Sequence, residues 1–112
     1  MRVGERVFVA GTAPQFDDGT CPTDPALQAR RCFEIIGEAL SAAGSSFADV
    51  VRTRIYLVST GDFAPISAVH GEYFHDIRPA NTTIVVKELL DTRWKVEIEA
   101  EAVISPERSP VL

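Results

Sequence analysis

The sequence predicts an α+β fold in which two helices cover one face of a single mixed β-sheet. Two stretches repeat apolar residues every three or four positions, as amphipathic helices do, and the other apolar stretches are short and have strand character. Along the chain the predicted elements are a hairpin, a helix, a strand, a helix and two strands. Both helices are long enough to pack on one face of a sheet, so this order favours a two-layer sandwich.

The chain is predicted to begin with a β-hairpin. One strand ends at Val3, Gly4-Glu5 form the turn, and the second strand runs through Gly11. Residues 12–23 contain two prolines and an Asp-Asp-Gly turn sequence but no apolar period. We therefore expect a loop there.

The next element is the first helix. Asp24 is a suitable N-cap, Pro25 suits the first helical position, and Gly44 supplies a left-handed cap at the C-terminal end. The apolar residues that recur between them with the helical period are Ala29, Cys32, Phe33, Ile36, Leu40 and Ala43. Cys32 lies on this stripe, where we expect a buried, reduced thiol.

Residues 49–58 alternate with the two-residue period of a strand. One side carries Val51, Thr53, Ile55 and Leu57, and the other carries Arg52, Arg54, Tyr56 and Val58. We expect the first side to face the helices, which leaves the second side as a charged face.

A second helix is predicted to open at Thr60-Gly61-Asp62 and to end before Pro79. Its apolar side consists of Phe63, Ile66, Val69, His70, Tyr73 and Phe74. Pro65 is tolerated because it lies in the first turn. After this helix we expect a strand at residues 81–87 and a connection at residues 90–93.

The last strand is predicted from Trp94 to Ile104. Its apolar residues Val96, Ile98, Ala100 and Ala102 alternate with Lys95, Glu97, Glu99 and Glu101. Side chains two residues apart on a strand are about 7 Å apart, so the three carboxylates repel one another. We therefore expect cations, water or a ligand opposite them. Residues 1–104 form the single domain, and residues 105–112 form a C-terminal tail.

The composition limits the partners of this chain. Its 112 residues are 46% apolar and 24% charged, with a formal net charge of −5. Phosphate binding needs a clustered basic surface, so we expect no nucleic-acid partner. No apolar run approaches the ~20 residues of a membrane span, and the N-terminus lacks the apolar block of a signal peptide. We expect a cytoplasmic protein with no membrane partner.

Residue types that bind metals are scattered along the sequence. Cys21 and Cys32 are eleven positions apart, and no CxxC pair is present. His70 and His75 have no ligand-type residues spaced to complete a metal site, so both are interpreted as structural. We expect neither a metal nor a cofactor.

Two motifs in the last quarter of the chain resemble the RidA (YjgF) family of small trimeric proteins. They are Pro79-Ala80-Asn81 before a strand and Val96-Glu97-Ile98-Glu99-Ala100 in the last strand. The resemblance implies a fold similar to small bacterial chorismate mutases, a homotrimer, and a ligand cleft at each subunit boundary. It also implies hydrolysis of a reactive imine or enamine, such as 2-iminopropanoate, to a 2-oxo acid and ammonia.

The resemblance also suggests which residues form the site. Gly11 matches a glycine that lets backbone approach the ligand, and Glu97 matches the catalytic glutamate that holds the attacking water. Asn81 stands where the family has an arginine that clamps a substrate carboxylate, and Thr83 stands where active members often have cysteine. Either Asn81 selects a neutral or differently shaped ligand, or another cation replaces the arginine. The candidates are Arg78, Arg93, Arg52 and Arg54.

Each of these residues also has a plainer interpretation. Gly11 can end a strand, Glu97 can be a solvated carboxylate, and Asn81 can bond local backbone. Arg52 and Arg54 are more readily ion-pair partners of the glutamates than substrate clamps. Trp94 is expected to pack at the strand end.

Three functions remain open from the sequence. The first is hydrolysis of an imine or a related C=N or C=O compound by a homotrimer of a branch that lacks the arginine. The alternative is a non-catalytic metabolite-binding or chaperone-like homotrimer on the same scaffold. A structural homotrimer without a ligand is the third. Glu97 separates the first two, because only catalysis needs a group that activates water.

Overall fold

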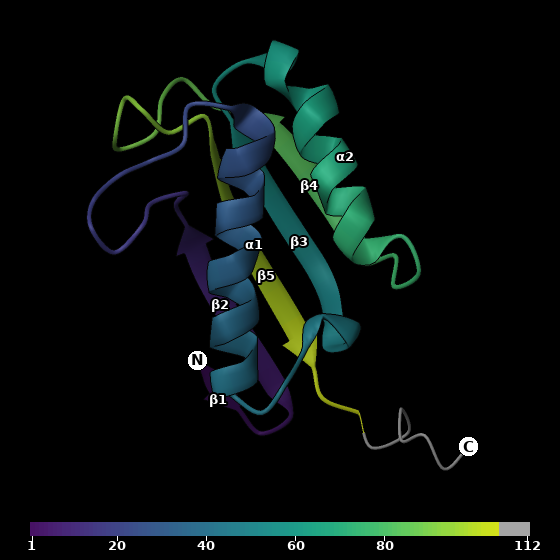
Figure 1. Ribbon diagram of the computed structural model, residues 1–112. Helices are drawn as coiled ribbons and strands as arrows, with labels where there is room; N and C mark the ends of the chain where they lie inside the picture. The colour runs from purple at the N-terminus through teal and green to yellow at the C-terminus, as the bar shows by residue number, and fades with distance from the viewer. Residues whose placement is uncertain (106–112) are drawn as a thin grey trace.

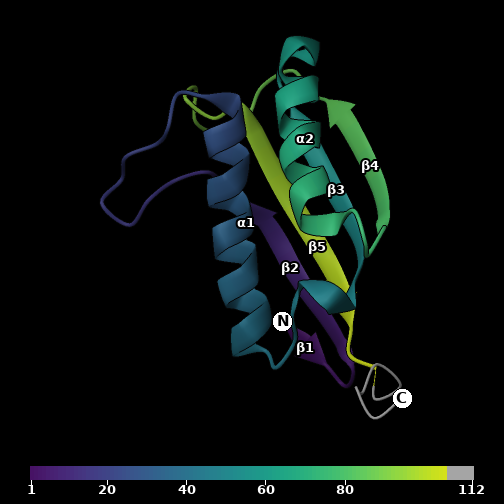
Figure 2. The same ribbon diagram turned by 45° about the vertical axis from the view of Figure 1, so that its right-hand side comes forward.

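The computed structural model describes residues 1–105 as one five-stranded sheet with two helices on one face (Figures 1 and 2). The elements are β1 (Arg2–Val3), β2 (Arg6–Thr12), α1 (Pro25–Ala42), β3 (Val50–Leu57), α2 (Phe63–Phe74), β4 (Ala80–Val85) and β5 (Val96–Val103). The strand order is β1-β2-β5-β3-β4, in which only the β3–β4 pair is parallel. The predicted fold class is confirmed. The predicted tail lies outside the described residues from residue 106 onward.

The hydrophobic core fills the layer between the sheet and the helices. The alternation along β5 is preserved, because its apolar residues are buried and its glutamates face the other way. The largest fully buried side chains are Phe33, Phe74, Ile36, Leu40, Leu57, Ile66 and Ile98. This packing leaves one face of the sheet uncovered by helices.

The caps of α1 form as the sequence predicts. The carboxylate of Asp24 accepts a hydrogen bond of 3.0 Å from the backbone nitrogen of Leu27, and Pro25 occupies the first turn. Gly44 follows the helix with φ of +81°, the left-handed conformation that glycine adopts at low cost. Cys32 is a free, buried cysteine, as expected.

The start of β3 departs from the predicted alternation. Val51 is 39% exposed, whereas Val50 is 2% exposed and belongs to the core. The register with β5 shifts between Val50 and Arg52, which is a β-bulge. The prediction that Val51 faces the helices is therefore wrong, because the bulge turns this one side chain outward. Thr53, Ile55 and Leu57 are buried as predicted.

A buried amide connects the loops at one end of the sheet. Gln28 on α1 is 0% exposed, and its Nε2 donates to the carbonyl oxygens of Pro22 at 2.7 Å and Arg93 at 2.9 Å. Its Oε1 accepts from the backbone nitrogen of Lys95 at 2.7 Å. Three hydrogen bonds satisfy the amide, so Gln28 fixes the loop before α1 against the start of β5.

Some element ends differ from the predicted positions. A short 3₁₀ turn at Thr60–Asp62 precedes α2, and β4 ends at Val85 rather than at residue 87. β5 begins at Val96 rather than at Trp94, because the backbone nitrogen of Trp94 donates to the Asp91 carbonyl in a turn and not to a neighbouring strand. Within residues 1–105, neither helix has the length and apolar character that a membrane crossing requires.

Candidate functional site

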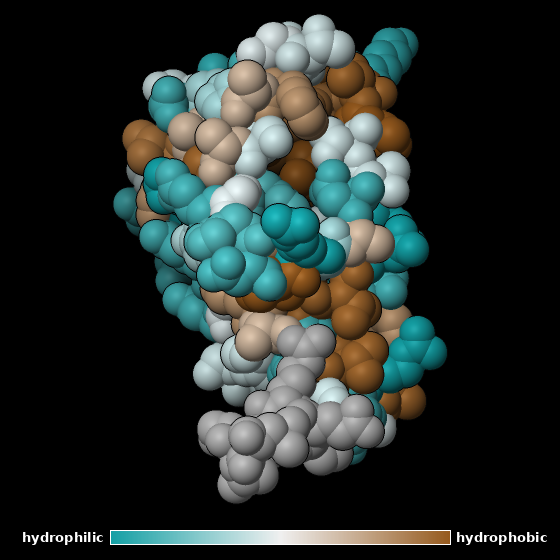
Figure 3. Space-filling model, turned by 90° about the vertical axis from the view of Figure 1, so that its right-hand side faces the viewer, coloured by the Kyte–Doolittle hydropathy of each residue, from teal (hydrophilic) through white to brown (hydrophobic). Residues whose placement is uncertain are grey.

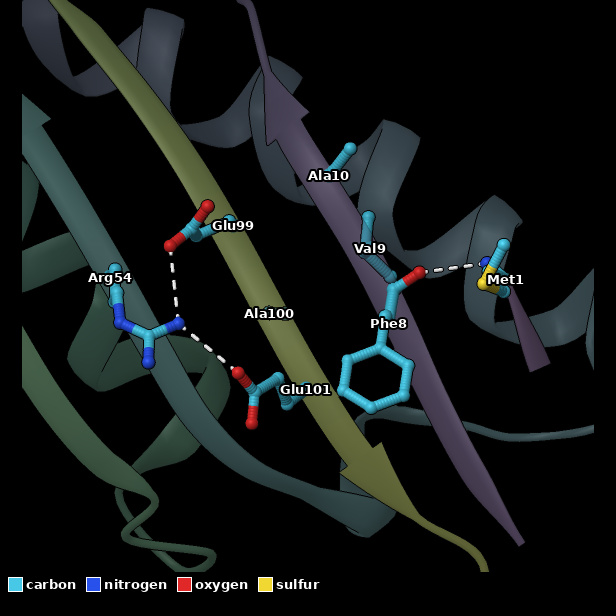
Figure 4. Close-up of a pocket in the computed structure, with 8 residues that line it drawn as sticks. All are labelled: Met1, Phe8, Val9, Ala10, Arg54, Glu99, Ala100 and Glu101. Atoms are coloured by element: carbon cyan, nitrogen blue, oxygen red, sulfur yellow. Dashed lines mark hydrogen bonds and ion pairs between the residues drawn. The ribbon is translucent and has the colours of Figure 1, made fainter. Parts of the chain in front are cut away.

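The uncovered face of the sheet, here called the open face, carries charged side chains, of which Figure 4 shows Arg54, Glu99 and Glu101. Arg54 of β3 lies between two carboxylates of β5, at 3.2 Å from Glu99 and 3.1 Å from Glu101. The Tyr56 hydroxyl donates to Glu99 at 2.9 Å, and this hydrogen bond raises the pKa of Tyr56. Arg54, Glu99 and Glu101 also line a hollow of about 320 Å³. The predicted ion-pair role is confirmed for Arg54.

Arg52 does not form the predicted ion pair. It lies opposite Glu101 in the β3–β5 register, yet its side chain has no hydrogen bond or ion pair within the described part of the chain. Arg54 forms ion pairs with both nearby carboxylates, Glu99 and Glu101. The register of β3 with β5 also shifts next to Arg52, at the bulge. The ion-pair interpretation is therefore wrong for this arginine.

Glu97 is the third carboxylate of the open face, and it stands beside Gly11. Among residues 1–105 no hydrogen bond or ion pair involves its side chain, although the residue is partly buried. A Cβ atom at residue 11 would collide with the Glu97 carboxylate. The glycine therefore makes the space that this carboxylate occupies. The structure brings together these two predicted site residues, which come from β2 and β5.

The thiol nearest to this site is not a nucleophile. Cys32 of α1 donates its S–H to the carbonyl oxygen of Thr12 at 3.3 Å. Burial, followed by the charge of Glu97, raises its pKa well above the ordinary range of thiols. The sulfur therefore stays protonated near neutral pH, which excludes thiolate chemistry at this position.

Asn81 and Thr83 lie on the other face of the sheet, toward α2. In the parallel β3–β4 register, Asn81 pairs with Thr53 and Thr83 pairs with Ile55. Thr53 and Ile55 are buried on the helix side, so their β4 neighbours share that side. One copy of the chain therefore divides the predicted site residues between opposite faces of its sheet.

A hydrogen-bonded chain connects these β4 residues to α2. The Thr83 hydroxyl donates to Asn81 Oδ1 at 2.9 Å, and Asn81 Nδ2 donates to Thr53 Oγ1 at 3.0 Å. Thr53 Oγ1 in turn lies 2.9 Å from Nε2 of His70. Burial lowers the pKa of His70, which favours the neutral imidazole.

Sequence reasoning missed the part that His70 and Thr53 take in this cluster. His70 is on the apolar side of α2 as predicted, but it contacts a polar residue of the sheet. The signal was a threonine inside the buried alternation of β3, since a buried hydroxyl requires a partner. Nothing in the sequence identified that partner.

Two of the four arginines considered as replacement cations, Arg78 and Arg93, lie away from the Asn81 side chain. The exposed Arg78 has φ of +53° in the turn between α2 and β4, and its Nε donates to the His75 carbonyl at 3.3 Å. Arg93 bonds both carboxylate oxygens of Asp91 and the Gly19 carbonyl, and this hydrogen bonding lowers the pKa of Asp91. Neither arginine lines the pocket beside Asn81.

Comparison with known proteins identifies the family. A family model described as Endoribonuclease L-PSP matches residues 1–104. The crystal structure of Rv2704 from Mycobacterium tuberculosis, described as a member of the YjgF/YER057c/UK114 family, superposes with a TM-score of 0.85 at 38% identity. That match covers 92% of this chain and 82% of Rv2704. The protein belongs to the RidA/YjgF family.

Two curated relatives extend this RidA/YjgF assignment. Protein DfrA of Myxococcus xanthus is 39% identical over 103 residues, which cover 89% of this chain and 77% of DfrA. The 2-iminobutanoate/2-iminopropanoate deaminase of Bos taurus is 36% identical over 85 residues, which cover 76% of this chain and 61% of the bovine protein. The family resemblance of the two sequence motifs is thus confirmed.

Proposed function

We propose that this protein is a homotrimer that binds a small metabolite at each subunit boundary and hydrolyses an imine or enamine there. The observation that carries the proposal is the carboxylate of Glu97, which is partly buried, has no partner among residues 1–105, and occupies the space kept free by Gly11. The name of the bovine relative, an imine deaminase, supports the same reaction class.

The chemistry requires little more than a positioned water. Glu97 accepts a proton as the water oxygen attacks the carbon of the C=N bond, and the proton passes to the nitrogen. The resulting carbinolamine loses ammonia, which leaves a C=O group, so one water is consumed and one ammonia is released for each imine. Holding the water beside the imine carbon lowers the entropic part of the barrier.

The division of the site between two faces supports an intersubunit cleft. Gly11 and Glu97 lie on the open face, whereas Asn81 and Thr83 lie on the helix side, so a single sheet separates the two pairs. A ligand can touch both pairs only if two copies contribute one pair each. The proposed cleft therefore needs a second copy to be complete.

Exposed apolar side chains support the same assembly. On the open face Phe8, Val51 and Ile84 are 36%, 39% and 46% exposed, and they surround the charged residues. Figure 3 shows apolar side chains at the surface on the side of the molecule where α2 lies. Phe63 of α2 and Val85 of β4 are 48% and 50% exposed. A neighbouring copy would cover these residues.

The substrate is proposed to differ from the 2-imino acids that an arginine clamp would hold. Asn81 offers a neutral amide, and neither Arg78 nor Arg93 lines the adjacent pocket. A bidentate arginine–carboxylate pair contributes roughly 1.5 to 3 kcal/mol, against about 0.5 to 1.5 kcal/mol for a neutral hydrogen bond. We place the chain in a branch without the arginine. The same observation favours the alternative of a non-catalytic, metabolite-binding or chaperone-like homotrimer.

Nucleic acid and membranes are not part of the proposal. The family description mentions an endoribonuclease, but the net charge of −5 opposes binding to a polyanion. The proposed reaction needs no cofactor, because water and a carboxylate suffice. A cytoplasmic location stays a prediction.

Replacement of Glu97 tests the proposed reaction. An amino-acid oxidase generates imines from a panel of amino acids, and the protein is assayed for faster release of 2-oxo acid in the presence of semicarbazide, which traps imines. Glu97→Gln should lower any activity by about 100-fold or more, since one general base typically contributes roughly 10² to 10⁴-fold. Glu101→Gln is the matched control on the same strand face and should retain activity. Equal activity of the unmodified protein, Glu97→Gln and Glu101→Gln would show that Glu97 does not activate the water.

Sedimentation velocity tests the assembly. A trimer has three times the 12.2 kDa mass of one chain. A stable monomer at micromolar concentration would contradict the proposed cleft, since each half of the site would stand alone.

A further inference from the structure

A small polar pocket lies between α2 and β4. It has a volume of about 40 Å³, enough for a small end group of a ligand. Its polar lining consists of Ser67, His70, Asn81 and Thr83, and its apolar walls include Phe63 and Ile66. No charged side chain within residues 1–105 lines this pocket.

The hydrogen bonds behind the pocket have a defined direction. Thr53 Oγ1 accepts a hydrogen bond from Asn81 Nδ2. Within residues 1–105, the only other side-chain atom that this hydroxyl contacts by a hydrogen bond is His70 Nε2. Thr53 is 0% exposed, so its own proton must go to that nitrogen to be satisfied. His70 is therefore the acceptor at the end of the chain and carries its proton on Nδ1.

This direction fixes the amide of Asn81. Its nitrogen faces two acceptors, the Thr53 hydroxyl at 3.0 Å and the Thr53 carbonyl at 3.4 Å, while its oxygen accepts the Thr83 hydroxyl. A flipped amide would place its oxygen against the Thr53 carbonyl, which is also an acceptor. The Thr53–His70 contact thus stabilises one orientation of the amide at the pocket.

The fixed amide suits an uncharged ligand group. A carboxylate entering the pocket would lose water and would find hydroxyls and an amide but no cation. A neutral amide, hydroxyl or carbonyl can donate to the oxygens of Asn81 and Thr83 or accept from Ser67 without that desolvation cost.

We propose that His70 is the positioning residue of this pocket, which through Thr53 holds the Asn81 amide so that the pocket receives an uncharged polar group in preference to a carboxylate. The inference rests on the proposed cleft, because the pocket must belong to a binding site. The ligand class, an uncharged polar group, follows from the hydrogen bonds of this chain.

The test compares two probes of the same shape and different charge. Pyruvate carries a carboxylate, and pyruvamide carries a neutral amide in its place. Both are titrated into the full-length protein, and the side-chain NH₂ signal of Asn81 and the backbone signals of β4 are followed by NMR. We expect pyruvamide to bind at least about threefold more tightly than pyruvate, with the largest shifts at Asn81 and Thr83.

Three variants separate the role of His70 from a purely structural one. His70→Phe keeps a ring beside Phe33 and Phe74 but has no acceptor, and Thr53→Val removes the hydroxyl at nearly constant volume. Both should erase the preference and shift the Asn81 NH₂ signal. His70→Gln places an oxygen near the position of Nε2 and should retain the preference. If His70→Phe does not fold, Thr53→Val and His70→Gln still decide the question.

The remaining outcomes overturn the proposal. Equal or tighter binding of pyruvate by the unmodified protein would contradict the neutral pocket. If both His70→Phe and Thr53→Val still prefer pyruvamide to pyruvate, then His70 does not position the Asn81 amide. Absence of binding by either probe at millimolar concentration would show that the pocket is not a binding site. None of these results depends on imine hydrolysis, so the proposed reaction stands or fails separately in the oxidase-coupled assay.

Discussion

The end of the open face near Glu97 and the pocket beside Asn81 differ in how their polar groups are satisfied. On the open face, Arg54 pairs with two glutamates and the Tyr56 hydroxyl donates to one of them. The third glutamate, Glu97, has no side-chain partner in the described chain. In the pocket, side-chain hydrogen bonds link Thr83, Asn81, Thr53 and His70 in one chain, and within residues 1–105 no lining side chain is charged.

This difference separates two tasks. An unpartnered carboxylate is available to hold and activate water, because its oxygens accept no hydrogen bond from other residues of the described chain. A neutral cluster whose side chains are linked by hydrogen bonds has a defined geometry and suits recognition more than proton transfer. Under the proposed function, we therefore expect Glu97 to carry the reaction and the cluster of Asn81 to select the ligand.

The largest predicted effect comes from filling the space at Gly11. In Gly11→Ala the new methyl group meets the carboxylate of Glu97, which is the flexible end of a side chain and can swing away. Displacing the carboxylate by about 1 Å should lower activity by roughly 100-fold, while the free energy of unfolding changes by less than about 1 kcal/mol. Steady-state kinetics and urea unfolding measure the two quantities.

Gly71→Ala is the matched control for that variant. A Cβ atom at Gly71, on α2, meets nothing within 4 Å. Alanine favours the helix over glycine, so stability should rise by about 0.5 to 1 kcal/mol with no change in activity. An equal loss of activity in both variants would show that the effect at residue 11 does not act through Glu97.

A smaller effect is predicted for the pocket. Asn81→Arg introduces the cation that the pocket lacks, and it should raise the hydrolysis of 2-iminopropanoate by about tenfold, the equivalent of about 1.4 kcal/mol. The oxidase-coupled assay measures this change. The variant also removes the donor to Thr53 Oγ1, so a modest loss of stability should accompany it.

Asn81→Gln controls for side-chain length without adding charge. It should leave 2-iminopropanoate hydrolysis unchanged or lower. If the arginine and glutamine variants behave alike, then charge at residue 81 has no influence on the substrate, and the division of tasks between the two regions is wrong.

The contrast between the regions also explains what the sequence could predict. On β5 the alternation of apolar and acidic residues specifies both faces, so the open face and the pairing of Arg54 follow from a two-residue period. The position of Gly11 beside Glu97 follows less directly, since it depends on the register of β2, which shifts between Val9 and Thr12. The family resemblance indicated that both residues belong to one site, but it did not predict their contact.

The pocket could not be predicted in the same way. β4 is an exposed edge strand with little apolar alternation. Its sequence therefore does not predict on which face of the sheet the Asn81 side chain lies. That is decided by its parallel register with β3 and by the way α2 packs across it. The outward bulge at Val51 was missed for a related reason, because one extra residue reverses the alternation without a local sequence signal.

The smallest predicted effect concerns the dependence of stability on pH. Burial lowers the pKa of His70, and its neighbours Phe33, Phe74 and Thr53, from α1, α2 and β3, carry no charge. As the pH falls, the unfolded chain takes up this proton near its ordinary pKa of about 6.5, before the folded protein does. The contribution of His70 is therefore fully present above that pH and is lost as the pH falls through the lower pKa of the folded state. Thermal unfolding between about pH 7.5 and 5.5 should show a steeper fall in Tm for the unmodified protein than for His70→Gln, by about a few degrees. His75 is present in both proteins and cancels in the comparison, so parallel curves would mean that protonation of His70 is not opposed by the cluster.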